Sequence, residues 1–326
     1  MRTGAAAGHV GYYHEALTYA SDAELLAVVV PFLSGGVAEG EPTIVALGEQ
    51  HAELVRAELP PEVAGRVEFH PGGDMYARPA SAIRSYREML AGHTAGGAGQ
   101  IRIIGELPPA ELGATWDWWA RYESAINHSY DEFPLWSMCA YDTRVTPAHV
   151  LADVARTHPR TARPGDEHAP NADYVVPGEF LGRHTPVALD PLQLTPPAVD
   201  LQDPAAAETR AAIARLNERG ILSRRQLGDL QLAITEVVTN GLTHGTPPVT
   251  VRCWAGADRI VTTVTDRGRG PKDPFAGLQA AAHAPNGGFG LWLAHQLCDH
   301  VAMTRDEDGF TLRLISGDPY HRVGEA

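Results

Sequence analysis

The stretch EVVTNGLTHG, residues 236–245, decides how the second half of this chain is expected to fold. It closes a run in which apolar residues recur at spacings of three and four, as in a core-facing helix: Leu227, Leu230, Ile234, Val237 and Val238. Glu236, Asn240 and His244 recur every four residues, so they lie on one face of that helix. A Gly-Thr-Pro-Pro turn follows at once. The pattern predicts a helix that presents a carboxylate, an amide and an imidazole in a column.

The composition is that of a soluble globular protein, and it excludes several classes. The 326 residues suffice for two domains, and 44% of them are hydrophobic and 20% charged. A formal net charge of −14 argues against direct nucleic-acid binding, which needs clustered Lys and Arg. The longest apolar run, Leu25–Leu33, is too short to span a membrane, and no secretory signal is expected. Three widely spaced cysteines favour reduced thiols, so we expect a cytoplasmic protein.

The first half of the chain alternates strand-like and helix-like segments up to about residue 158. The strand-like segments are short and apolar: 9–14, 42–47, 66–70, 100–106 and 134–142. The helix-like segments lie between and after them: 21–36, 51–59, 79–93, 112–127 and 146–157. Such alternation predicts parallel βαβ units in an open, doubly wound α/β sheet. Residues 158–174 are polar and turn-rich, and a strand-like pair at 173–181 and 184–190 is expected to complete the domain.

A proline-rich stretch separates the two halves. Its prolines rule out a helix or a central strand: Pro186, Pro191, Pro196, Pro197 and Pro204. We therefore expect a first domain over residues 1–190, a linker over 191–205 and a second domain over 206–326.

The second half follows a different order, with two helices before the strands. Helices are expected at 205–220, 223–245 and 290–298, and Ser223 is a plausible N-cap of the second. The expected strands are 248–254, 259–266, 300–305 and 309–315. This order predicts helices on one face of a mixed sheet, an α+β sandwich.

Polar and glycine-rich motifs follow this order in a way that suits a nucleoside triphosphate. An amide oxygen from Asn240 suits Mg²⁺, which otherwise keeps water and phosphate ligands. A buried Asp266 carboxylate can accept from the exocyclic amine of adenine, and Gly268 and Gly270 leave the backbone free to approach the base. Glu236, one turn before Asn240, is a candidate general base for an attacking hydroxyl.

The start of the last expected helix offers a phosphate site. Backbone amides of Gly288 and Gly290 at a helix N-terminus can donate to phosphate oxygens. His244 fits the polar column as well, but an interaction between a helix-terminal His and the helix dipole explains it better.

With these motifs in order, the second domain resembles the GHKL (Bergerat-fold) ATPase domain, and within it the bacterial anti-sigma-factor serine/threonine kinases. The motifs that carry the resemblance are E-x-x-x-N-x-x-x-H at 236–244, D-x-G-x-G at 266–270 and G-G-F-G-L at 287–291. The resemblance implies ATP and Mg²⁺ as cofactors, with Asn240 as the Mg²⁺ ligand, Asp266 reading adenine and Glu236 as the base. Family members carry a Thr near the final hairpin that shares a water with adenine, and Thr311 is the nearest candidate here.

Three outputs of such a domain remain open from the sequence. The first is a serine/threonine kinase that phosphorylates a STAS-type antagonist of an anti-sigma factor and sequesters a sigma factor. The second is a non-catalytic module that binds its partner in an ATP-dependent way. The third is a sensor histidine kinase, although the helix at 205–220 holds no phosphoacceptor His. A homodimer is compatible with each.

The first domain resembles the MEDS sensory domain, a degenerate RecA-like module. The segments that carry the resemblance are HVGYYH at 9–14, PTIVAL at 42–47 with its preceding helix, IRIIGE at 101–106, the helix holding residues 122–127, and CAYD at 139–142. The resemblance implies a regulatory input domain. We expect a small-molecule signal pocket with His9, Glu106 and Glu123 at its rim; capping or solvation would explain these residues equally well.

Overall fold

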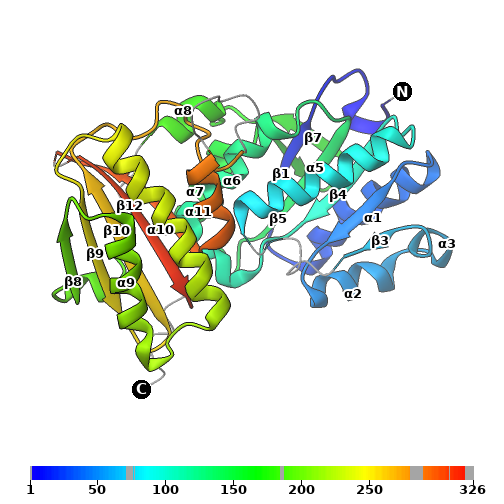
Figure 1. Ribbon diagram of the computed structural model, residues 1–326. Coiled ribbons are helices and arrows are strands. Elements are labelled where there is room, and N and C mark those ends of the chain that lie inside the picture. The colour runs from blue at the N-terminus through cyan, green and yellow to red at the C-terminus, as the bar shows by residue number, and fades with distance from the viewer. Residues whose placement is uncertain are drawn as a thin grey trace. The chain divides into compact units, whose positions relative to one another are not determined.

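The computed structural model describes residues 2–70, 76, 78–183, 187–279, 289–307 and 309–319 (Figure 1). The chain divides into two compact units, each with its own sheet. The N-terminal unit holds Met1–Ala77 and Ser81–Phe180, and the C-terminal unit holds Arg78–Ala80 and Leu181–Ala326.

The N-terminal unit is built on a seven-stranded sheet with the order β3-β2-β4-β5-β1-β6-β7. Its strands are β1 (Tyr13–Tyr19), β2 (Thr43–Ala46), β3 (Glu68–Phe69), β4 (Ile101–Gly105), β5 (Leu135–Asp142), β6 (Arg160–Arg163) and β7 (Glu167–Pro170). Neighbouring strands pair in parallel, except that β6 and β7 are antiparallel. The prediction of an α/β domain on a largely parallel sheet is confirmed.

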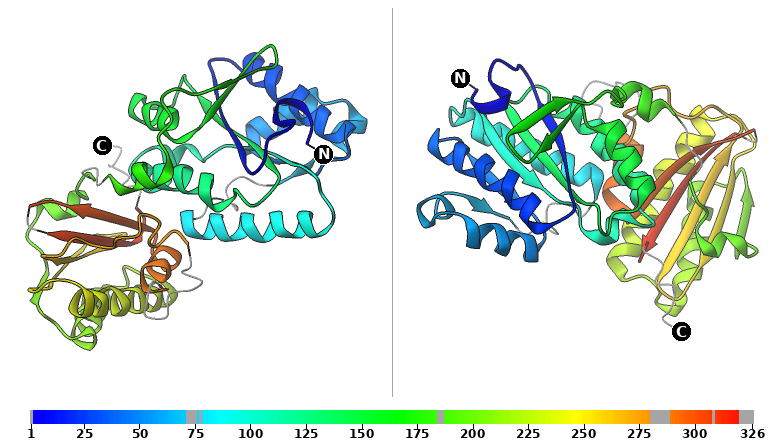
Figure 2. Two further views of the ribbon diagram at one scale, coloured as in Figure 1. Left: turned by 90° about the horizontal axis from the view of Figure 1, so that it is seen from above. Right: turned by 180° about the vertical axis from the view of Figure 1, so that it is seen from behind.

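Helices connect these strands and cover both faces of the sheet (Figure 2). They are η1 (Gly4–Ala6), α1 (Asp22–Ala38), α2 (Glu49–Glu58), α3 (Pro61–Ala64), α5 (Pro79–Ala95), η2 (Pro109–Leu112), α6 (Trp116–Ser129), α7 (Ala148–Thr157) and α8 (Pro177–Gly182). Every residue of β2 and β4 is buried, as expected for central strands covered on both faces.

The central strands send alternate side chains to opposite faces. Tyr13 and Leu17 of β1 join Trp136 of β5 in the apolar cluster beneath α1. His14, the residue after Tyr13, points the other way and bonds to Asn127 of α6. This face of the sheet therefore meets α6 with polar groups.

The structure differs from the expectations at the ends of this domain. β1 begins at Tyr13, since Gly11 has a φ of +83° and turns the chain before it. The polar stretch 158–174 contains β6 and β7, joined by a tight turn at Gly165 and Asp166 with φ of +90° and +59°. Where a strand was expected at 173–181, the helix α8 forms instead, with Pro177 in its first turn.

The C-terminal unit has a five-stranded sheet with the order β11-β12-β10-β9-β8. Its elements are η3 (Pro191–Leu194), β8 (Val199–Gln202), α9 (Ala206–Leu216), η4 (Asn217–Arg219), α10 (Arg224–His244), β9 (Thr250–Ala255), β10 (Arg259–Asp266), α11 (Phe289–Leu297), β11 (His300–Arg305) and β12 (Phe310–Gly317). All strand pairs described are antiparallel, so the expectation of a mixed sheet is wrong. Helices α9, α10 and α11 lie on one face of this sheet (Figures 1 and 2).

The stretch 191–205, expected to be a linker, contributes the edge strand β8, which pairs with β9 and, among the described residues, with no other strand. An edge strand tolerates flanking prolines because one side of its backbone needs no ladder partner. The N-cap expected for α10 is present: the Ser223 hydroxyl accepts from the Gln226 backbone N–H at 3.3 Å and a capping box closes the turn. The residues of the polar column thus lie on one continuous helix.

Candidate functional site

A cavity of about 410 Å³ lies between the end of α10 and the sheet of the C-terminal unit. That volume is within the range of small-molecule sites, about 300–1,000 Å³. Apolar side chains of the helices and strands line it: Val237, Val264, Leu291, Phe310 and Leu312. Polar residues converge on the same space: Asn240, His244, Thr246, Asp266 and Arg269. Such a lining accommodates a flat apolar group whose polar edge is recognised at a few points.

Asp266, the last residue of β10, is the buried anion of this cavity, with 8% of its surface exposed. Its Oδ1 accepts hydrogen bonds from the backbone N–H groups of Thr246, at 3.0 Å, and Gly268, at 2.6 Å. Within the described residues Oδ2 has no hydrogen-bond partner. No group of the described residues occupies this oxygen, so it is available to accept from a ligand N–H.

Glycines keep the space around Asp266 clear. A Cβ at Gly268 would lie 2.5 Å from Asp266 Oδ1, and one at Gly245 would lie 2.7 Å from its Cγ. Gly270 has a φ of +71°, and a Cβ there would meet the Phe310 ring at 2.4 Å. No other residue fits these positions without displacing the carboxylate or the cavity wall.

The polar column of α10 lies at the junction with α11. A Cβ at Gly290 would lie 2.9 Å from Asn240 Nδ2 and 3.0 Å from Glu236 Oε2, so both side chains face the first turn of α11. Asn240 lines the cavity; Glu236, one turn earlier, is not among the described residues that do. His244 is exposed and lines the outer end of the cavity. The amide and the carboxylate are therefore neighbours beside the cavity.

Two of the residues expected to contact the nucleotide are not among the described residues that line the cavity. Thr311 lies on β12 between Phe310 and Leu312, which line the cavity, so its side chain points to the opposite face of the sheet. Its hydroxyl bonds to that of Thr265 at 2.8 Å. Gly288 lies outside the described residues.

The three residues expected at a sensory pocket are not brought together. His9 is exposed before the amino end of β1 and its Nε2 contacts the Tyr12 carbonyl at 3.1 Å. Glu106 follows the carboxyl end of β4, at the opposite edge of the sheet, and bonds to His51 Nδ1 at 2.9 Å. Glu123 is buried on α6. No single rim contains all three.

Sequence reasoning missed two parts of these sites. The Thr246 N–H that fixes Asp266 belongs to the turn after α10, and the Gly-Thr-Pro-Pro sequence signalled only a turn. The His51 partner of Glu106 begins its own helical segment, so nothing local in the sequence links the two. Both contacts join residues far apart in the chain.

Comparison with known families decides what the two units are. Residues 13–159 match the MEDS family, described as the methanogen/methylotroph, DcmR sensory domain. Residues 200–316 match the histidine kinase-like ATPase domain. The chain joins a MEDS domain to a histidine kinase-like ATPase domain. Both family resemblances drawn from the sequence are confirmed, and the cavity with Asp266 lies in the ATPase-like domain.

Among solved structures, the crystal structure of the RsbU and RsbW domains of Rv1364c from Mycobacterium tuberculosis is similar to this chain, with 22% identity and a TM-score of 0.28. The similarity covers 38% of this chain and 32% of that one, so the chain spans about a third of that relative's length. No curated protein matches this chain. None of the helices within the described residues is both long and apolar enough to cross a membrane.

Proposed function

We propose that the ATPase-like domain binds ATP with Mg²⁺ and transfers a phosphoryl group to a Ser or Thr of a partner protein, under control of the MEDS domain. One observation carries the proposal: Asp266 lines a cavity of about 410 Å³, and two backbone N–H groups bond to its Oδ1 and leave Oδ2 available. In fold terms, we assign the ATPase-like domain to the Bergerat sandwich and the MEDS domain to a degenerate RecA-like sheet.

The described residues fit an adenine nucleotide. Asp266 Oδ2 accepts from the exocyclic amine of adenine, and the bare backbone at Gly268 and Gly270 lets the ring lie against the loop. Apolar side chains from α10 and the sheet cover its faces. Adenine is uncharged, so these contacts would orient it through a hydrogen bond to a carboxylate that backbone donors hold in place.

The phosphates and the metal belong at the junction of α10 and α11. The Asn240 side-chain oxygen would hold Mg²⁺, an ion that prefers oxygen ligands and keeps several waters. The backbone N–H of Gly290, in the first turn of α11, would meet phosphate oxygens. Gly288 lies outside the described residues, and the same role is proposed for it from the sequence motif alone. When bound, ATP supplies the phosphoryl group, and Mg²⁺ offsets its negative charge.

Glu236 is the residue we assign to the proton. It shares a helix face with Asn240, and both side chains meet Gly290. From there its carboxylate would orient the hydroxyl of the acceptor Ser or Thr and take its proton. The partner we propose, from the family resemblance, is a STAS-type antagonist, with a sigma factor as the protein sequestered.

The first test is a calorimetric titration of the full chain with Mg-ATP. We expect micromolar affinity, on the order of −8 kcal/mol, and loss of most of it in Asp266→Asn. Asn keeps an oxygen for the two backbone donors and replaces only the acceptor that faces the cavity. Asp200→Asn is the matched control, because Asp200 pairs with Arg252 on the exposed edge of the same sheet. Equal loss in both variants, or none in either, would refute the nucleotide site.

The second test follows radiolabelled phosphate from ATP to an antagonist protein. Transfer to Ser or Thr, stable in acid, supports the kinase. Mg-ATP binding with partner capture but without transfer would favour the sequestration module, a function that needs no contact between Glu236 and the cavity. An acid-labile phosphohistidine on the chain itself would favour a histidine kinase.

A further inference from the structure

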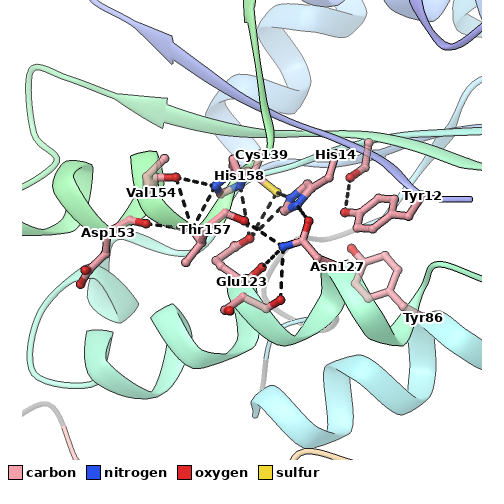
Figure 3. Close-up of polar contacts among 12 residues, drawn as sticks. Tyr12, His14, Tyr86, Glu123, Asn127, Cys139, Asp153, Val154, Thr157 and His158 are labelled. Carbon is pink, nitrogen blue, oxygen red and sulfur yellow. Dashed lines mark hydrogen bonds and ion pairs between the residues drawn. The ribbon is translucent and has the colours of Figure 1, made fainter. Parts of the chain in front are cut away.

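Four side chains capable of binding a metal converge in the core of the MEDS domain (Figure 3). They are His14 of β1, Glu123 of α6, Cys139 of β5 and His158, which follows α7. Their ligand atoms all lie within 4.8 Å of one another. His14, Glu123 and His158 are buried, and Cys139 is partly buried. Three elements and a connecting residue thus place nitrogen, sulfur and oxygen donors around one point.

Four of the six distances between these donors are close to those of a tetrahedron around a metal ion. Zinc bonds of 2.0–2.3 Å put neighbouring ligand atoms about 3.3–3.7 Å apart. Cys139 Sγ lies 3.4 Å from His14 Nε2 and 3.6 Å from Glu123 Oε2. Glu123 Oε2 lies 3.8 Å from His14 Nε2 and 3.4 Å from His158 Nε2. An ion can sit among these atoms with little movement of the side chains.

The hydrogen bonds of His14 turn its free lone pair toward the other donors. Asn127 Nδ2 donates to three backbone carbonyls, those of Glu123 at 3.0 Å, Ser124 at 3.2 Å and Thr157 at 2.8 Å. Its Oδ1 is therefore the atom that faces His14 Nδ1, at 3.0 Å, and His14 must donate from Nδ1. Neutral His14 then carries its lone pair on Nε2, as a metal ligand oriented by a carbonyl partner does.

His158 is oriented in the same way. Its Nδ1 lies 2.9 Å from the Val154 carbonyl, which can only accept, so the proton is on Nδ1. Its Nε2 is buried and has no hydrogen-bond partner among the described residues. This lone pair points at a Glu123 carboxyl oxygen 3.4 Å away, and either a proton on that carboxyl group or a cation must bridge the two atoms. A cation between them would satisfy both.

Burial shifts the four groups toward their uncharged forms. It raises the pKa of Glu123 to about 7 and the pKa of the Cys139 thiol well above its usual range. It lowers the pKa of His158 to about 4 and that of His14 well below its ordinary value. The cluster therefore contains no positive charge of its own to pair with an ionised Glu123 or Cys139.

We propose that His14, Glu123, Cys139 and His158 form a tetrahedral binding site for a divalent transition-metal ion, with Zn²⁺ the ion that this N₂SO donor set suits best. Binding replaces the thiol proton of Cys139 and any proton on Glu123 by bonds to the metal, and those protons leave to solvent. With four protein ligands and no open position, the ion would be structural or regulatory. Cys139 also borders a cavity of about 20 Å³ among tyrosines, a space next to the site.

The direct test is the metal content and spectrum of the full chain. After expression with zinc supplied, we expect about one zinc per chain, with an absorption-edge fine structure of one sulfur and three nitrogen or oxygen neighbours. Refolding with Co²⁺ should give the intense visible bands of tetrahedral cobalt and a thiolate charge-transfer band. A folded wild-type chain that takes up neither ion, or zinc without a sulfur neighbour, would overturn the site.

Two cysteine variants separate this site from adventitious binding. Cys139→Ser should abolish the charge-transfer band and the stoichiometric zinc. Cys253→Ser should keep both, since Cys253 is a buried free thiol in the other domain. A band that survives in Cys139→Ser and vanishes in Cys253→Ser would contradict the assignment. If Cys139→Ser does not fold, Glu123→Gln and the wild-type fine structure carry the same decision.

Discussion

Asp266 in the ATPase-like domain and Glu123 in the MEDS domain are both buried carboxylates, but their neighbours differ in kind. Backbone N–H groups donate to one oxygen of Asp266, and the residue lines a cavity. Glu123 faces two imidazole lone pairs and a thiol sulfur. A carboxylate held by backbone donors can recognise a donor on an organic ligand, whereas one that faces two imidazole lone pairs can share a cation with them. The same functional group therefore points to a nucleotide in one domain and to a metal in the other.

The largest effect is expected on the rate of phosphoryl transfer when the proposed general base, Glu236, is replaced. Glu236→Gln removes the proposed base while keeping the size of the side chain. We expect phosphoryl transfer to fall about 10²–10⁴-fold. The affinity for Mg-ATP should change little, because Asp266 and the glycines still hold the adenine ring. Single-turnover transfer and calorimetry measure the two quantities. Transfer at the wild-type rate would remove Glu236 from the mechanism.

The two ligands should stabilise different cooperative units. At a free concentration one hundred times its Kd, either ligand stabilises the state that binds it by about 2.7 kcal/mol. In differential scanning calorimetry, the shift produced by Zn²⁺ should vanish in Cys139→Ser and survive in Asp266→Asn. The shift produced by Mg-ATP should show the reverse pattern. If either variant abolished both shifts, the two ligands would not act through separate sites, and the distinction between the two carboxylates would be wrong.

Glycines of α10 test how closely the nucleotide cavity is packed. A Cβ at Gly245, the residue that caps α10, would lie 2.4 Å from the Gly241 carbonyl and 2.7 Å from Asp266 Cγ, so Gly245→Ala should cost about 1–3 kcal/mol. Gly228 is exposed in the same helix with nothing within 4 Å of such a Cβ. Gly228→Ala should stabilise the domain by up to about 1 kcal/mol. Chemical denaturation measures the free energy of unfolding of both variants. An unchanged value in Gly245→Ala would show that the cavity wall moves to accommodate the added methyl group.

The smallest effect concerns a His–carboxylate pair that is not a metal site. His168 Nδ1 lies 2.9 Å from Glu15 Oε1, in direct contact, unlike His158 and Glu123. Burial lowers the pKa of His168, but the hydrogen bonds and charges of Glu15 and Asp166 together outweigh it and raise the pKa above 6.5. The stability lost in His168→Gln should be full below pH 6.5, the value for the unfolded chain, and decline as pH rises through the folded pKa. A loss that grows with pH would contradict this ion pair.

The sequence predicted most of the architecture because hydrophobic periodicity is local. The apolar stripe of α10 and the buried run of β4 identify their elements without knowledge of the rest of the chain. The hairpin of β6 and β7 escaped notice because its short strands are polar and only a turn at Gly165 joins them.

The candidate sites divide in the same way. Asn240 and Asp266, which line the cavity, could be singled out because each lies in a motif of a few residues. Thr311 points to the other face of β12, and spacing alone does not give the face of a strand. The metal cluster joins His14 to His158, and no short motif contains both. Only the parallel pairing of β1 with β5 and the packing of α6 against that face bring its members together.

The central claim is that Asp266 recognises the exocyclic amine of adenine. Inosine triphosphate carries a carbonyl oxygen in place of that amine, so the nucleotide and the side chain can be changed separately and together. We predict that the wild-type chain binds Mg-ATP about tenfold to a hundredfold more tightly than Mg-ITP, and that Asp266→Asn removes the preference. Equal affinity of the wild-type chain for the two nucleotides, or an undiminished preference in Asp266→Asn, would contradict the account.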